Sequence, residues 1–174
     1  MLFDRAFLVT NLSFIYRTML ASAGPLLDFA AAHAFGSLRD YYLSHAGEER
    51  GHDQMLRDDL LRLGVAEIDR YHGAAQLVGS QYYLVAHDHP ALLLGYMAVM
   101  EGNAMPLEMV DQLEAHHKVE LTCLRHHAAH DPGHFEAVKA QIARLAPELQ
   151  SRVHWNARCT ISFINSLQLP HGVQ

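Results

Sequence analysis

Apolar residues recur at spacings of three and four along most of this sequence, and alternation with a period of two is nearly absent. Spacings of three and four place apolar side chains on one face of a helix, whereas a half-buried strand needs strict alternation. The sequence therefore predicts an all-α protein. We expect helices at residues 4–20, 25–34, 37–63, 74–87, 90–116 with Pro106 as a candidate break, 118–130, 133–145 and 148–168.

Residues that commonly begin and end helices support these boundaries. Gly36 and Ser37 predict a turn and an N-cap, and Gly64 follows a leucine-rich end as a C′ glycine does. Pro90 and Pro147 are placed for a first helical turn. The sequence has no repeat, low-complexity tract or linker, so residues 1–174 are expected to form a single helical domain with its functional site in the core.

Composition narrows the class of protein. Only 18% of residues are charged, the net charge is −6, and no Lys/Arg-rich run is present, so a nucleic-acid partner is not expected. A membrane span is not expected either, because Glu101 interrupts Ala91–Leu107 and no other apolar stretch approaches the roughly 20 residues required. The cysteines, Cys123 and Cys159, form no CxxC pair, which favours a reducing cytoplasm.

The first candidate ligands lie in the motif HAGEERGHD. His45, Glu49 and His52 are related by steps of four and three residues on the expected inward face of helix 37–63, so their side chains could reach one ion. Glu48 is adjacent and could replace Glu49. The alternative interpretation is that the motif is a solvated run of charges on the helix surface.

A single carboxylate interrupts the next apolar segment. Glu101 is the only charged residue from Pro90 through Leu107. A helix that is apolar on all sides is buried, and a buried carboxylate is unfavourable unless it is paired, protonated or bound to a metal. The alternative is that Glu101 reaches water at a helix end marked by Gly102.

The third motif is CLRHHAAHDPGH. His127, Asp131 and His134 follow one another at steps of four and three residues, so they again share a helix face. Asp131 followed by Pro132 could instead be an N-cap and a first helical residue. The two roles are compatible, because one carboxylate oxygen can cap while the other coordinates.

These residues form a mixed nitrogen and oxygen donor set. Such a set suits iron or manganese better than structural zinc, for which thiolates would be expected. The chain has 14 histidines, but composition alone is a weak indicator of metal. Five histidines near predicted helix ends or loops are expected to be solvated: His33, His72, His87, His89 and His171.

The order of the motifs, HxxxExxH, then GYMAVMEG, then HHAAHDPGH, resembles the haem-oxygenase-like di-iron oxidases and oxygenases. These are iron-containing redox enzymes related in fold to the TenA and PqqC proteins. The resemblance covers roughly Ser37 to Leu145 and implies a haem-oxygenase-like bundle of about seven helices that holds two iron ions, with manganese as an alternative. The ligands that it implies are His52, Glu101, His127, Asp131 and His134.

The first-helix ligands depart from the resembled family. That family commonly places a glutamate seven residues before the histidine equivalent to His52, and this chain has His45 there. Either His45, Glu48 or Glu49 could complete the site. We favour Glu49, because charge balance around two Fe(II) ions favours three carboxylates.

The resemblance implies a di-iron oxidoreductase that uses O2 as a co-substrate to oxidise a small molecule resembling an amino acid, an amine or a fatty acid. No nicotinamide or flavin motif is present, so electrons would come from an external reductant or from the substrate. The alternatives are a metal-free TenA/PqqC-like ligand-binding or hydrolase module and a metal-storage or sensing bundle. A homodimer is an alternative to a monomer. Four residues could line a pocket but are expected to be core residues: Tyr82, Tyr83, Met97 and Met100.

Overall fold

The computed structural model describes residues 3–68 and 72–167, and over these residues the chain is helical without strands. The predicted all-α bundle is confirmed. None of the described helices is long and apolar enough to cross a membrane. The elements are α1 (Arg5–Ser22), α2 (Pro25–His33), α3 (Gly36–Glu49), α4 (His52–Arg62), α5 (His72–His87), the 3-10 helix η1 (Pro90–Leu92), α6 (Leu93–Glu101), α7 (Leu107–His117), α8 (Thr122–Ala143) and α9 (Pro147–Ser166).

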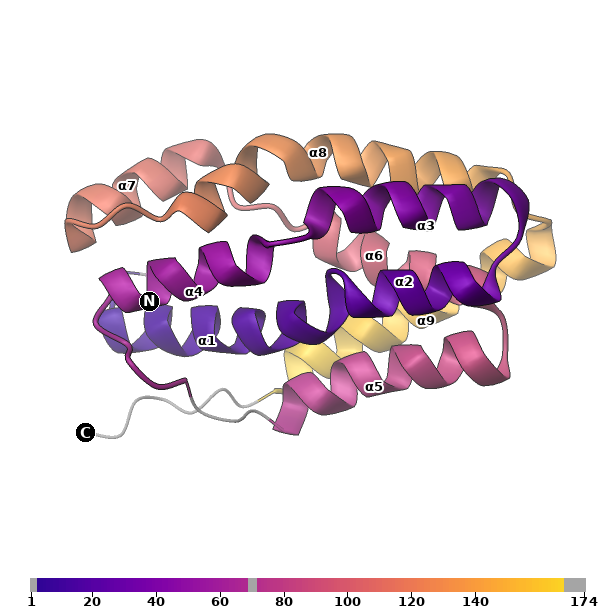
Figure 1. Ribbon diagram of the computed structural model, residues 1–174, viewed down its shortest axis with the longest axis horizontal. Helices are drawn as coiled ribbons and strands as arrows, with labels where there is room; N and C mark the ends of the chain where they lie inside the picture. The colour runs from indigo at the N-terminus through magenta and orange to yellow at the C-terminus, as the bar shows by residue number, and fades with distance from the viewer. Residues whose placement is uncertain (1–2, 69–71, 168–174) are drawn as a thin grey trace.

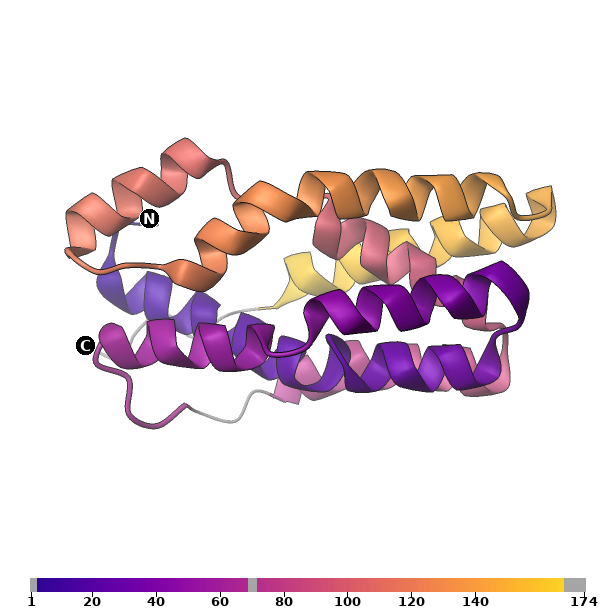
Figure 2. The same ribbon diagram turned by 45° about the horizontal axis from the view of Figure 1, so that its top comes forward.

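The helices form an elongated bundle whose two ends are built from different elements. Figure 1 shows α1, α4 and α7 at one end, α2, α3, α5 and α9 at the other, and α8 running along both. The turned view in Figure 2 agrees, with α2 and α3 side by side. One core cluster, around Ala30, Leu77 and Leu94, fills the end built from α2, α3, α5, α6 and α9. A second, around Leu8 and Leu60, fills the other end.

The predicted helix 37–63 is wrong as a single element. It breaks between α3 and α4 at Gly51, whose φ of 92° lies in the left-handed region that favours glycine. The predicted N-cap at Ser37 is also wrong, because α3 begins at Gly36. Gly64 does follow α4 in a left-handed conformation, with φ 77°, as predicted.

The predicted helices 118–130 and 133–145 are one continuous helix, α8, with Pro132 in its interior. A proline there removes one backbone hydrogen bond and crowds the preceding turn, which weakens this part of the helix. Asp131 therefore lies inside α8, and its alternative interpretation as an N-cap is wrong.

The start of α8 is capped from another helix. The fully buried carboxylate of Asp59 in α4 accepts hydrogen bonds from the backbone nitrogens of Thr122 and Cys123 at 2.9 and 2.8 Å. These are orphan donors of the first turn, which a local capping residue usually satisfies. Asp59 thereby fixes the position of α8 relative to α4.

The predicted helix 90–116 is divided into η1, α6 and α7, with Pro106 immediately before α7. Pro90 and Pro147 both occupy first helical turns, as predicted. Helix α6 lies very close to α9: a Cβ atom on Gly95 would lie 2.3 Å from the carbonyl oxygen of Val153. This close approach fixes α6, and with it Glu101 at its last turn.

Candidate metal centre

The residues predicted as ligands converge between the two core clusters. They lie at the end of α3, the start of α4, the end of α6 and the middle of α8. His45, Glu49 and His52 are only 4–6% exposed, so the interpretation of their motif as a solvated surface run is wrong for these three residues. Glu101 is 11% exposed although it is the last residue of α6, so it is turned inward rather than towards water.

The side chains form two donor groups that share one residue. Within each group the donor atoms all lie within 4.8 Å of one another. Atoms about 2.1 Å from one ion lie at most about 4.2 Å apart, so a small inward shift would close each group on a cation. Glu49 belongs to both groups, and its two oxygens could serve two ions. The first group is His45, Glu49, Glu101 and His134; the second is Glu49, His52 and His127.

In the first group, Glu101 lies between two imidazoles. Its Oε1 is 3.2 Å from Nε2 of His45, and its Oε2 is 3.5 Å from Nδ1 of His134. Burial disfavours the charged carboxylate, but the hydrogen bonds and positive charge of His134 and His45 outweigh it and lower the pKa of Glu101 to about 2. Glu101 is therefore ionised near neutral pH.

In the second group, Nδ1 of His52 lies 3.0 Å from Oε2 of Glu49. Burial opposes ionisation of Glu49, but the hydrogen bond and charge of His52 lower its pKa below the ordinary value. The rings of His52 and His127 meet edge to face, 4.9 Å apart. An imidazole from α4 and one from α8 thus lie beside the same carboxylate.

Asp131 has a different position from the other predicted ligands. It is in neither donor group, and its Oδ1 accepts a hydrogen bond from Nδ1 of His127 at 2.8 Å. Burial lowers the pKa of His127, but Asp131 and then Cys123 outweigh it and raise the pKa to about 11. A carboxylate on one imidazole nitrogen orients the other nitrogen towards a metal, so this geometry suits a residue that positions His127.

Three buried polar atoms at the centre have no hydrogen bond of normal geometry among the described residues: Glu49 Oε1, His127 Nε2 and His134 Nδ1. Buried polar atoms are almost always paired, and exceptions call for an explanation. Cations bound in the two donor groups would satisfy all three atoms. Carboxylates and imidazoles without thiolates suit iron or manganese, so the residues present fit such an ion.

Glu48 lies at the rim of the centre. Its side chain is 53% exposed, and its Oε2 is 3.3 Å from Nε2 of His134. Between the two neighbouring glutamates, Glu49 is the buried one that belongs to both donor groups. The structure thus gives Glu49 the more suitable position for a ligand.

Sequence reasoning missed two residues that border the centre. The ring of Tyr41 stacks on His45 with centroids 5.8 Å apart, and burial, helped by the charge of Glu101, raises its pKa. The buried thiol of Cys123 donates to the backbone carbonyl of His52 at 3.7 Å. Each lies four residues before a predicted ligand histidine, and that spacing was the signal that could have found them.

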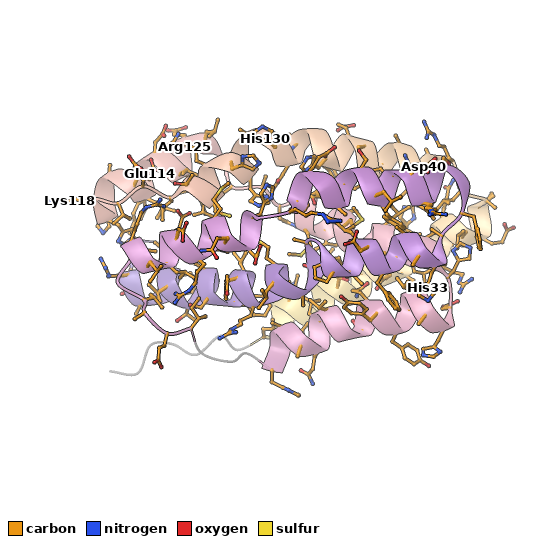
Figure 3. All side chains as sticks on the ribbon, in the orientation of Figure 1. His33, Asp40, Glu114, Lys118, Arg125 and His130 are labelled. Carbon is orange, nitrogen blue, oxygen red and sulfur yellow. The ribbon has the colours of Figure 1, made fainter. Side chains whose placement is uncertain are left out.

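Three of the five histidines predicted to be solvated have that position. His33, His72 and His87 are exposed, and Figure 3 shows His33 at the end of α2. The prediction is wrong for His89, which is half-buried and accepts a hydrogen bond from the backbone nitrogen of Ala91 at the start of η1. His171 lies outside the described residues.

The centre opens onto a cavity of about 610 Å³. Five residues of the centre border it, and apolar residues of α1, α2, α6 and α9 form most of its walls. Met97 and Met100 line this cavity, whereas Tyr82 and Tyr83 do not. The expectation that Tyr83 is a core residue is wrong, since it is 65% exposed. The five residues of the centre at the cavity are His45, Glu49, Glu101, His127 and Asp131.

Comparisons with protein-family models, with curated proteins and with solved structures give no match. The arrangement of the described side chains is therefore the observation from which a function can be proposed.

Proposed function

We propose that the protein binds two iron ions at this centre and uses them, with O2, to oxidise a small molecule held in the adjoining cavity. The observation that carries the proposal is Glu49, a buried carboxylate that belongs to two donor groups at the edge of that cavity. A carboxylate shared by two sites is the feature that distinguishes a dinuclear centre from a single-metal site. Manganese fits the same donors. The motif order that resembles haem-oxygenase-like di-iron enzymes supports the same function.

Each residue has a role that follows from its contacts. His45, Glu101 and His134 would hold one ion, His52 and His127 the other, and Glu49 would lie between them. Bound iron would supply O2 activation and electron transfer, which amino-acid side chains do not provide. Asp131 holds Nδ1 of His127 and leaves Nε2 directed at the centre. The apolar walls would exclude water from the substrate.

Anaerobic Fe(II) titration tests the proposal. We expect saturation near two equivalents in the unaltered protein and a loss of at least one equivalent in Glu101→Gln. The matched control is Glu108→Gln, which alters an exposed glutamate of α7 and should leave the stoichiometry unchanged. Saturation at one equivalent would contradict a dinuclear centre, and no specific binding would contradict the metal function.

The cavity also favours a second function, that of a metal-free ligand-binding or hydrolase module of the TenA/PqqC type. In such a module the histidines would line a ligand pocket, and Glu101→Gln would change no metal content. The titration separates the two functions. Consumption of O2 that depends on an added organic substrate then separates an oxidase from a metal-storage bundle.

A further inference from the structure

The cavity contains a cluster of hydroxyl groups that the metal centre does not use. Thr18 and Ser22 lie one turn apart on α1, and Tyr96 faces them from α6, with its hydroxyl beside Ser22. Thr18 is 1% exposed and Tyr96 is 4% exposed. All three residues line the cavity.

Two of these hydroxyls have no hydrogen-bond partner of normal geometry among the described residues: Thr18 Oγ1 and Tyr96 OH. A threonine in a helix can donate to the carbonyl one turn earlier, but Thr18 does not. Buried hydroxyls without partners are unfavourable by about 1–3 kcal/mol each in mutational data. Two such groups in one apolar cavity indicate that a ligand group pairs with them.

The charges around the cavity limit what that ligand can be. Among the described residues that line the cavity, every titratable one except Tyr96 and the buried thiol Cys123 belongs to the metal centre. None of these lining residues is a lysine or an arginine. Apart from the hydroxyl cluster, the other polar residues that line the cavity are three neutral amides, Asn11, Asn103 and Asn165. A carboxylate or ammonium held away from the centre would be desolvated without a counter-charge, which is strongly unfavourable.

We propose that the cavity binds an uncharged, mainly apolar molecule with one hydroxyl or carbonyl group, and that this group hydrogen-bonds to Thr18 and Tyr96. A volume of about 610 Å³ is in the range of small-molecule sites. Binding of this molecule requires no metal. Only the statement that it is the oxidised substrate rests on the proposed function. The inference narrows the expected substrate to a molecule whose part held away from the centre is uncharged, since the only charged residues that line the cavity belong to the centre.

The methionines provide a direct readout in the metal-free protein. Met19, Met97, Met100 and Met105 line the cavity, whereas Met55 and Met109 do not. With [13C-methyl]methionine, 1-octanol should shift the four cavity signals and leave those of Met55 and Met109 unchanged. Octanoate and octylammonium should bind at least tenfold more weakly than 1-octanol, because Thr18 and Tyr96 offer no counter-charge to a charged head group.

Removal of the hydroxyls tests the contact itself. Thr18→Val and Tyr96→Phe should each weaken 1-octanol about three- to tenfold, the range expected for one neutral hydrogen bond, and should leave octane unchanged. The matched control is Thr160→Val, because Thr160 also has a buried, unpartnered hydroxyl but does not line this cavity. The two variants are independent, so either can carry the test if the other does not fold.

Several results would overturn the inference. They are no binding of 1-octanol, equal shifts at Met55 and Met109, octanoate binding as tightly as 1-octanol, or equal losses for 1-octanol and octane in the variants. Failure of the Fe(II) titration alongside selective 1-octanol binding would instead overturn the proposed oxidase function and leave this inference intact.

Discussion

Two helical segments carry most of the centre, and they differ in charge and in backbone. The segment α3–α4 supplies His45, Glu49 and His52 around a left-handed turn at Gly51. Helix α8 supplies its residues from one continuous element with Pro132 in the middle of them. The first segment has its irregularity in a turn that glycine adopts without strain. The second has a weakened backbone between its ligands, so we expect α3–α4 to be the preformed half and α8 the half that metal orders.

The largest effect is expected when Glu49, the residue that both donor groups share, is removed. Glu49→Ala should remove both ions, because Glu49 belongs to both donor groups, whereas His127→Ala should remove only the second. Iron content after anaerobic loading and desalting measures the difference. Glu48→Ala is the control, since its side chain is 53% exposed and lies at the rim. Retention of one full equivalent by Glu49→Ala would show that the two groups do not share this ligand.

The next prediction concerns the weakened backbone of α8. Pro132→Ala restores a backbone donor and relieves crowding, which should stabilise the metal-free protein by about 2 kcal/mol after allowance for the greater freedom of the unfolded chain. Hydrogen exchange across residues 124–138 should be slow in this variant without metal. In the unaltered protein the same segment should become protected only when Fe(II) is added. Equal protection with and without Fe(II) would show that α8 is preformed.

A smaller effect of opposite sign is expected in α3–α4. Gly51→Ala places a Cβ in the left-handed region at φ 92° and should destabilise the fold by about 1–2 kcal/mol and weaken metal binding. Gly47→Ala is the matched change within α3, where a new Cβ meets open space, and should stabilise by about 0.5–1 kcal/mol. Chemical denaturation of both variants measures the contrast. Equal stabilities would mean that the turn does not constrain this segment.

The smallest expected effect is in proton release. The pKa of His127 is raised to about 11, so at pH 7 a metal must displace its proton, whereas Glu101, with a pKa of about 2, is already ionised. Affinity for Mn(II) should therefore rise with pH. In the metal-free protein, the stabilising contribution of His127 is complete below its ordinary pKa of about 6.5 and is lost as pH rises through about 11.

Calorimetry in two buffers of different ionisation enthalpy gives the number of protons released. Asp131→Asn should lower the pKa of His127 and reduce the release at pH 7, because the neutral amide no longer favours the imidazolium. Asp40→Asn, at an exposed residue of α3 that Figure 3 labels, is the control. Unchanged release in Asp131→Asn would show that another group supplies the proton.

The sequence by itself determined the helical class and most of the residues that meet at the centre. Spacings of three and four residues place side chains on one face of a helix in any context, so His127 and His134 could be placed on the same face without knowledge of their surroundings. Glu101 was recognisable for a related reason, since a lone charge in an apolar helix must be buried against a partner.

Only the tertiary structure decided how those residues are used. Glycine can continue a helix or end it, and an interior proline can be tolerated or not, so packing set the break at Gly51 and the continuity of α8 through Pro132. The role of Asp131 also changed, from a predicted ligand or a possible cap to a partner of His127. Thr18 and Tyr96 carry no local pattern, because residues 78 positions apart line one cavity only when α1 packs against the helices around it.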